Sequence, residues 1–293
     1  MKAIRIALYG SRRQNPYLEI ISRFLVYLHQ RGIEVVAHPK LYGHLRDLRP
    51  GLAELMTCAP DGGFPADVYA VVSLGGDGTF LRTAHWVGDT QVPILGVNTG
   101  HLGYLTSVSI SDLALVPEWL ARDDARTEDL HVLQVDYEGA PHPFYALNEV
   151  SVTKDIHSSI INCAVALDRP DDHLAVYRAD GVILSTAAGS SAYNLSLGGP
   201  VCAPTAPVMI LTPIAAHSLS LRPLILGEGS RVFFTPAGRS ETFCLQNDGE
   251  THILAMGTRV ECRMAPFVVR RFVFADNTLA RTLREKLNWG GES

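Results

Sequence analysis

Residues 75–79 read GGDGT and directly follow an apolar run, so bare backbone and a carboxylate occur at one point of the chain. Glycine costs backbone entropy on folding, and such a cluster therefore serves a tight turn, a close ligand, or both. A strand, a glycine turn and a helix form an arrangement that binds phosphate, because N–H groups at a helix N-terminus favour an anion. This turn is our first candidate site.

Two common nucleotide loops do not match the turn. A dinucleotide fingerprint GxGxxG starting at Gly76 requires glycine where Leu81 stands, and a Walker A loop requires Lys-Ser or Lys-Thr where the chain has Thr79-Phe80. The unusual residue is Asp77, because a carboxylate repels phosphates. It suits a metal ion carried by the phosphates, or a proton taken from a hydroxyl that is about to be phosphorylated. The alternative is that Asp77 only fills a turn.

Two other segments offer polar groups near predicted strands. Residues 96–106, GVNTGHLGYLT, follow the next strand, and loops after neighbouring parallel strands meet at the same edge of a sheet, where ligands bind. Asn148-Glu149 interrupts an otherwise apolar β-run. Successive side chains of a regular strand face opposite ways, so both can meet one ligand only at a strand end or bulge. A polar pair on an edge strand is the alternative.

Residues 177–200, YRADGVILSTAAGSSAYNLSLGGP, form a third polar segment. Its Asp180-Gly181 dipeptide could be a two-residue hairpin turn, because Asp-Gly is a strong hairpin signal. Beyond it, hydroxyl groups, free N–H groups and one aromatic ring would suit a ribose and a base.

The elements that must position these residues change character along the chain. The first third alternates strands and helices, which predicts a parallel sheet covered by helices. Gly32 suits the residue after a helix end. We expect strands at 4–9, 33–37, 68–74 and 93–97, helices at 16–31 and 79–87, and a polar linker between residues 37 and 68.

From about residue 130, short β-rich runs punctuated by Gly, Pro, Asn and Asp predict a β-sandwich or layered β-domain. We expect strands at 131–137, 145–153, 160–167, 174–178, 182–186, 208–213, 231–235 and 242–246. The predicted domains are an α/β nucleotide-binding domain at 1–125 and a β-rich domain at 126–275. An amphipathic helix within 276–293 is expected to pack back on the first domain.

Composition narrows the class of protein. The 293 residues are 47% hydrophobic and 19% charged with a net charge of −5, and no basic stripe suggests a nucleic-acid partner. The five cysteines show no CxxC and no metal-ligand spacing, which predicts reduced buried thiols rather than a disulfide framework or a zinc site. The start lacks a signal-peptide pattern, and no stretch reaches the ~18 apolar residues of a membrane span. We therefore expect a cytoplasmic protein without a membrane or nucleic-acid partner.

Taken together, the ordered motifs resemble the NAD kinase family. GGDGT lies at 75–79, the NxGxLGFL-like segment at 98–105, the NE pair at 148–149 and the DGxxxSTPTGSTAYxLSxGGP signature at 180–200. A TPxxxHSLxxRP segment follows at 212–223, a DGQ-like element at 248–250 and a KLGW-like end at 286–289. The matches extend over most of the chain from residue 71 to 289. Several such motifs in this order are specific.

The resemblance implies an α/β N-terminal domain similar to phosphofructokinase and diacylglycerol kinases, followed by an all-β domain that holds NAD. The implied reaction transfers the γ-phosphoryl group of ATP to the adenosine ribose 2′-hydroxyl of NAD, with a divalent cation such as Mg²⁺ carried by ATP. A homodimer or homotetramer is also implied. The other readings are a lipid or sphingoid kinase that shares the GGDGT turn, and an NAD sensor without turnover.

Site roles follow from the resemblance residue by residue. Asp77 resembles the general base, and the implied NAD contacts are Asp77, Gly78, Tyr104, Asn148, Glu149, Arg178, Asp180, Ser191, Tyr193, Ser196 and Glu250. The implied residues on the ATP phosphate side are Gly75, Gly76, Thr79 and Arg82. The chain departs from the family at 187–191, where AAGSS replaces PTGST, and at Glu250, which replaces Gln and would add negative charge beside the ligand.

Overall fold

The computed structural model describes residues 4–10, 12–61, 63–100, 103–120, 126–155, 160–274 and 278–291. The chain divides into two compact units, residues 1–129 with 269–293 and residues 130–268, and it passes between them within the strands β7 (Arg126–Tyr137) and β18 (Val260–Val273). The boundary expected after residue 125 adjoins residues 121–125, which lie outside the described ranges. None of the described helices is long and apolar enough to cross a membrane.

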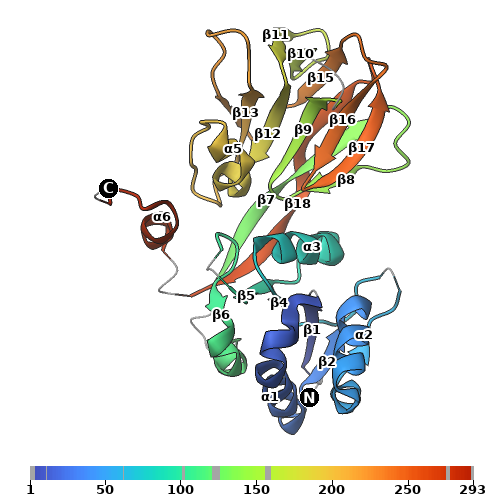
Figure 1. Cartoon of the computed structure of the whole chain (residues 1–293), viewed down its shortest axis with the longest axis vertical. Coiled ribbons are helices and arrows are strands. Elements are labelled where there is room, and N and C mark those ends of the chain that lie inside the picture. The colour runs from blue at the N-terminus through green and yellow to red at the C-terminus, as the bar shows by residue number, and fades with distance from the viewer. Residues whose placement is uncertain are drawn as a thin grey trace. The chain divides into compact units, whose positions relative to one another are not determined.

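The first unit is a parallel sheet with helices packed against it (Figure 1). The sheet order is β5-β4-β1-β2-β3. Both β6 and the C-terminal part of β18 pair with β5. The strands are β1 (Arg5–Gly10), β2 (Glu34–Ala37), β3 (Thr57–Cys58), β4 (Ala70–Leu74), β5 (Ile94–Asn98) and β6 (Val108–Ser109). The chain order reverses between β1 and β4, so the carboxyl ends of these two strands mark the expected ligand position of an open α/β sheet.

The helices of the first unit that precede residue 121 bury apolar side chains within the unit. They are α1 (Leu18–Gln30), α2 (Pro39–Leu48), α3 (Asp77–Val87) and the short α4 (Val116–Leu120), with 3₁₀ turns η1 (Arg12–Tyr17), η2 (Pro50–Leu55), η3 (Gly88–Thr90) and η4 (Ile110–Leu115). The predicted end of α1 is confirmed: Gly32 has a φ of +68°, and the N–H groups of Gly32 and Ile33 donate to the carbonyls of His29 and Leu28 at 3.0 Å.

The expectation of a polar linker between residues 37 and 68 is wrong. That stretch contains α2, η2 and β3, and Leu41 and Leu45 of α2 are fully buried in the core of the unit. Pro39 stands at the first position of α2, and the His38 ring accepts from the Lys40 N–H at 3.3 Å. Two buried leucines one helical turn apart therefore anchor this helix to the core, although most of its other positions are not buried.

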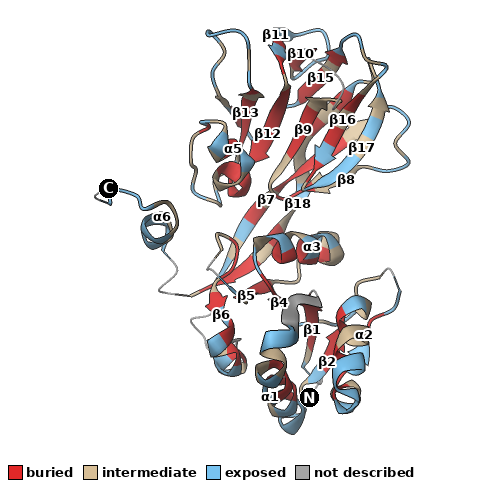
Figure 2. Cartoon of the chain, in the orientation of Figure 1, coloured by how far each residue is buried: buried red, intermediate tan, exposed pale blue. Residues whose placement is uncertain are grey.

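The second unit consists of two antiparallel sheets around one core (Figure 2). One sheet has the order β14-β13-β12-β9-β16-β17, and the other joins β11, β10, β15 and β18, with β7 and β8 attached. The remaining strands are β8 (Phe144–Ala146), β9 (Glu149–Lys154), β10 (Ile161–Leu167), β11 (His173–Ala179), β12 (Gly181–Thr186), β13 (Val208–Ile214), β14 (Leu224–Gly227), β15 (Val232–Ala237), β16 (Thr242–Asn247) and β17 (Glu250–Ala255). The short turns η5 (Ala188–Ser191) and α5 (Tyr193–Ser196) follow β12. The expected α/β unit followed by a β-rich unit is confirmed.

The C-terminal helix α6 (Leu279–Leu287) is amphipathic, as predicted. Thr278 caps its N-terminus by accepting from the Arg281 N–H at 3.2 Å. No residue of α6 is buried, and the neighbouring Trp289 is 57% exposed.

The core role of α2 gives the first testable prediction. Leu45→Ala should destabilise the protein by about 2–5 kcal/mol, because Leu45 is fully buried and its truncation leaves a cavity. Leu48→Ala on the same helix is the matched control, since Leu48 is 42% exposed and should change stability little. Urea unfolding followed by circular dichroism measures both variants. Equal, small effects would mean that α2 carries no core packing.

Candidate active site

Of the three glycines in the turn after β4, packing requires Gly75, whereas Gly76 and Gly78 have room for a larger residue. A Cβ on Gly75 would lie 2.3 Å from the Thr79 Oγ1, and the Gly75 N–H donates to the Val97 carbonyl at 2.9 Å. Gly75 is therefore bare because the first turn of α3 packs on it. A Cβ on Gly76 would meet nothing within 4 Å, and one on Gly78 would meet only Arg82 Nη1 at 3.9 Å. Both of these glycines are exposed.

Helix α3 begins two residues earlier than predicted, because the Gly76 carbonyl already accepts from the N–H groups of Thr79 and Phe80 at 2.8 and 3.1 Å. Asp77 is consequently the first residue of the helix, where a negative charge is favoured by the helix dipole. Arg82, one turn further along, is exposed, and its guanidinium donates to the Thr79 hydroxyl at 3.3 Å. The N-terminal part of α3 thus brings together the Asp77 carboxylate, the bare Gly76 and Gly78, and the Arg82 cation.

The Asp77 carboxylate is bound by the loop that follows β5. Oδ2 accepts from the Tyr104 N–H at 2.8 Å, and Oδ1 accepts from the Leu105 N–H at 3.0 Å. A Cβ on Gly103 would lie 1.9 Å from Oδ1, so only glycine allows this approach. A residue that merely fills a turn does not account for two hydrogen bonds to a loop some thirty positions away. Each oxygen accepts one N–H and so retains a second lone pair.

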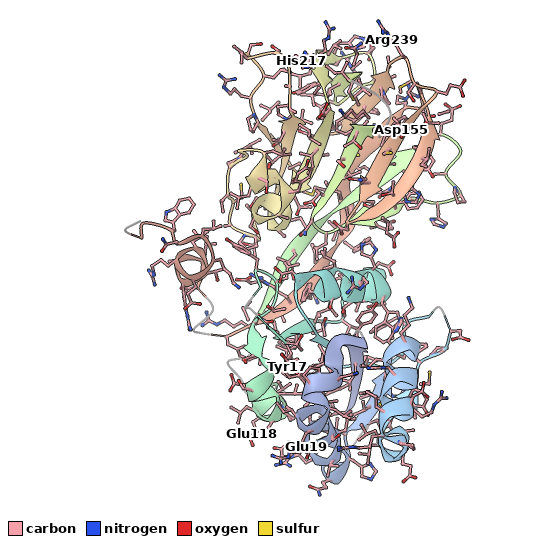
Figure 3. All side chains as sticks on the ribbon, in the orientation of Figure 1. Tyr17, Glu19, Glu118, Asp155, His217 and Arg239 are labelled. Carbon is pink, nitrogen blue, oxygen red and sulfur yellow. The ribbon has the colours of Figure 1, made fainter. Side chains whose placement is uncertain are left out.

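The same loop is fixed at two other places. The buried Asn98 side chain accepts from the Gly100 N–H at 2.7 Å, and the Tyr17 hydroxyl donates to the Thr99 carbonyl (Tyr17 is labelled in Figure 3). The Tyr104 hydroxyl is buried and has no hydrogen-bond partner among the described residues. Burial, together with the nearby Asp77 charge, raises the pKa of Tyr104, which keeps its hydroxyl protonated. His101 and Leu102 of the predicted 98–105 segment lie outside the described residues.

In the second unit, Asn148 and Glu149 lie at the start of β9, a strand hydrogen-bonded on both sides by β12 and β16. The predicted position at a strand end is confirmed, and the edge-strand alternative is wrong. The predicted single strand 145–153 is in fact two strands, β8 and β9, which belong to different sheets. The chain therefore passes from one sheet to the other at residues 147–148.

Asp248 causes that break and was not among the predicted site residues. Its carboxylate accepts from the N–H groups of Leu147, Asn148 and Glu149 at 2.6, 2.9 and 3.1 Å. Asp248 and Gly249 both have positive φ, +44° and +89°, as a two-residue type I′ hairpin between β16 and β17 requires. The Asp-Gly dipeptide at 248–249 signals the hairpin, but no sequence pattern reveals the three N–H partners.

The Glu149 carboxyl has the largest pKa shift among the described carboxylic acids of this unit. Burial, reinforced by the Asp248 charge, raises the pKa of Glu149 to about 7. Its Oε2 is buried and has no hydrogen-bond partner in the described part of the chain, and the same holds for the hydroxyl of Ser185, the residue directly opposite on β12. Opposed residues of an antiparallel pair share a face, so two unsatisfied polar groups lie on one face of the sheet. Near neutral pH the carboxyl can either donate or accept a hydrogen bond.

The segment after β12 is anchored to Asn148. The Thr186 N–H donates to the Asn148 carbonyl at 2.8 Å, and a Cβ on Gly189 would lie 2.1 Å from that carbonyl oxygen. Fully buried Asn194, another residue that was not predicted, donates to the Ser190 and Pro200 carbonyls at 3.1 Å and accepts from Thr212 at 2.7 Å. Among the implied NAD contacts here, Ser191 is half-buried, while Tyr193 and Ser196 are exposed. Glu250 is exposed at the start of β17.

Asp180 is not part of a hairpin. Strand β11 pairs with β10, whereas β12 pairs with β9 and β13, so Asp180 is another residue at which the chain passes between the sheets. Gly181 is bare because a Cβ would lie 2.5 Å from the Val152 carbonyl oxygen. The Asp180 carboxylate forms an ion pair with the Lys154 ammonium at 2.9 Å, and Arg178 is exposed on β11.

The structure gathers some predicted residues and separates others. Asn148, Glu149 and Gly189 lie together with Asp248, whereas Asp180 lies at the other end of β9. Gly181 pairs with Thr153 and Ser185 with Glu149, a separation of four residues or ~13 Å at ~3.3 Å per residue. The described residues include no group of three or more His, Cys, Asp or Glu side chains placed to hold a metal ion.

Comparisons with known proteins identify the family. The ATP-NAD kinase N-terminal domain model matches residues 11–124, and the ATP-NAD kinase C-terminal domain model matches residues 147–270. The NAD kinase of Porphyromonas gingivalis is 36% identical over 289 residues, which cover 98% of each chain. That of Bacteroides fragilis is 34% identical over 298 residues, or 99% of each chain.

Solved structures show the same fold. A crystal structure of yeast NADH kinase complexed with NADH has a TM-score of 0.86 at 23% identity and covers 99% of this chain and 89% of that one. A crystal structure of an NAD kinase from Archaeoglobus fulgidus in complex with ATP has a TM-score of 0.70 at 22% identity and covers 98% of both chains. With two matching domain models and full-length relatives above 30% identity, this chain belongs to the NAD kinase family.

Proposed function

We propose that this chain transfers the γ-phosphoryl group of ATP to the 2′-hydroxyl of the adenosine ribose of NAD, with Asp77 as the general base. The proton of the hydroxyl passes to Asp77, the freed oxygen forms a bond to the γ-phosphorus, and the bond from that phosphorus to the oxygen of ADP breaks. The products are NADP and ADP. The observation that carries this proposal is an oriented carboxylate beside two bare, exposed glycines at a helix N-terminus.

The hydrogen bonds of Asp77 support this role. Two backbone N–H groups fix the plane of the carboxylate, so it needs no reorganisation before it accepts a proton, and the remaining lone pairs are free for the hydroxyl. A positioned base typically contributes 10²–10⁴-fold to the rate. The N-terminus of α3 and the exposed Arg82 suit the phosphate groups of ATP.

The second unit supplies the binding surface for NAD in this proposal. Asn148 and Glu149 contact the adenosine, where a Glu149 carboxyl that titrates near pH 7 can donate to or accept from the nucleoside. Asp180, five residues from Ser185 and so about 17 Å away along the strand, contacts the nicotinamide end. Gly78, Tyr104, Arg178, Ser191, Tyr193, Ser196 and Glu250 complete the proposed NAD contacts.

Several finer properties stay predictions of the resemblance. We expect Mg²⁺ to enter with ATP as part of the substrate and to neutralise charge on the phosphates. A homodimer or homotetramer and a cytoplasmic location are expected on the same basis.

An assay of the proposed activity uses ATP, Mg²⁺ and NAD, with NADP detected by a coupled dehydrogenase. Turnover of a lipid in place of NAD would favour the lipid-kinase reading, and NAD binding without NADP formation would favour a sensor.

Asp77→Asn tests the role of the base. The variant should keep most of its affinity for NAD, while kcat falls by roughly 10²–10⁴-fold because Asn cannot take the proton. An Asn side chain has a single acceptor oxygen, so one of the two N–H groups loses its acceptor, and a modest stability loss of about 1–3 kcal/mol is also expected. Exposed Asp89, just past the end of α3, provides the control Asp89→Asn, which should leave NAD affinity, kcat and stability unchanged.

A titration of the rate against Mg²⁺ separates the base from a metal ligand. If Asp77 instead binds Mg²⁺, the Asp77→Asn variant needs more metal for half its maximal rate, and excess Mg²⁺ partly restores turnover. Near-normal turnover at ordinary Mg²⁺ would reject both roles.

Glu149 predicts a pH dependence of stability. Its folded-state pKa of about 7 lies above the ordinary 4.5, so the folded protein retains a proton that the unfolded chain releases. Stability therefore falls as pH rises from about 4.5 to 7, by an amount on the order of 3 kcal/mol at ~1.4 kcal/mol per pH unit. Glu149→Gln cannot ionise and should lack this loss. The melting temperature of the variant should exceed that of the wild type by more at pH 8 than at pH 5, and an equal difference at both would contradict the shift.

Asp180 should serve the ligand more than the fold. Its ion pair with Lys154 is partly exposed, with 43% and 30% of the two side chains accessible, so it adds little to stability. Asp180→Asn should melt near the wild-type temperature but bind NAD more weakly, as measured by calorimetry. Lys154→Met is the comparison: it removes the same ion pair, so an equal loss of NAD affinity would assign the effect to the pair and not to the Asp180 carboxylate.

A further inference from the structure

Arg271, near the end of β18, is a buried arginine that neither the family motifs nor the sequence analysis singled out. Arg271 is 9% exposed. The guanidinium donates through Nε and Nη2 to Glu128 Oε2 at 2.9 and 2.6 Å, and through Nη1 to the Tyr104 carbonyl at 2.7 Å. A single side chain thus joins β7, β18 and the loop after β5, and the three residues involved all belong to the first unit.

The contact with Tyr104 reaches Asp77 through one peptide group. The Tyr104 carbonyl and the Leu105 N–H belong to the same planar peptide. Arg271 donates to the oxygen of that peptide, and its N–H donates to Asp77 Oδ1 at 3.0 Å. The sequence of groups is therefore cation, peptide, carboxylate. A cation on the carbonyl polarises the peptide and strengthens its N–H as a donor.

We propose that Arg271 is a positioning residue for Asp77. It fixes the orientation of the 104–105 peptide and thereby the plane of the carboxylate, while Glu128 holds the guanidinium in place. The Tyr104 N–H, from the preceding peptide, binds the other oxygen of the same carboxylate at 2.8 Å. This inference rests on the proposed role of Asp77 as the base.

The neighbouring pair on the same two strands provides an internal comparison. Arg270 donates to Asp129 at 3.2 Å, one position along from Arg271 and Glu128. The Arg270 and Asp129 side chains are 42% and 53% accessible, against 10% and 34% for Arg271 and Glu128. Arg270→Gln therefore removes an arginine–carboxylate bond between β7 and β18 without touching the Tyr104 carbonyl, and it is the matched control.

The experiment measures kcat and KM for NAD in Arg271→Gln, Arg271→Lys and Arg270→Gln, each in the wild-type and the Asp77→Asn background. In the wild-type background, Arg271→Gln should lower kcat by about 10–100-fold, the effect typical of groups that orient a functional side chain, with little change in KM. Arg271→Lys should lose less, because its ammonium retains the charge but not the planar fork. Arg270→Gln should leave kcat unchanged.

The Asp77→Asn background separates positioning from general support of the fold. If Arg271 acts through the Asp77 carboxylate, its substitution should cost no further activity once that carboxylate is gone. An equal fold-loss in both backgrounds would overturn the proposal while leaving Asp77 as the base. Full activity in Asp77→Asn alone would reject the base and the positioning role together. Should Arg271→Gln fail to fold, the same comparison with Arg271→Lys decides.

Discussion

Two hydrogen bonds to the Asp77 carboxylate join the start of α3 to the loop after β5, and the geometry of the first unit's site depends on them. They require an unusually close approach of the two segments. Gly103 must be bare because the carboxylate oxygen occupies the place of its side chain, and Gly75 must be bare because Thr79 occupies the place of its own. A feature that looks like flexibility in the sequence is therefore a set of tight contacts in the structure.

The second unit uses the same device with a different carboxylate. Asp248 collects three consecutive N–H groups at the point where the chain leaves one sheet and enters the other. Those N–H groups are diverted from the strand ladder, so β8 ends and β9 begins there, and Asn148 and Glu149 lie side by side at a strand start. Burial raises the pKa of Glu149 and the negative charge of Asp248 adds to that rise, so one side chain sets the backbone path and also favours the protonated form of its neighbour.

Local sequence patterns predict much of this architecture. The alternation of strands and helices, the β-rich second part, the Gly32 helix end and the site motifs all correspond to observed elements. The helix α2 escaped prediction because its polar positions outnumber the buried Leu41 and Leu45. Two Asp-Gly dipeptides show the limit most clearly: the one at 248–249 forms a hairpin, whereas the one at 180–181 links strands of different sheets. Nothing local distinguishes them, because pairing across the fold decides.

The open glycines have a consequence for how the sequences of relatives are compared. Invariance at Gly75, Gly103 or Gly189 would carry no information about a ligand, because packing alone forbids a larger residue at each of them. Gly76 and Gly78 are different: the protein itself leaves room for a methyl group at both. If distant relatives also have glycine at these two positions, packing within the chain does not explain it. The need for glycine then comes from a bound molecule, and these two alignment positions carry information about the substrate rather than about the fold.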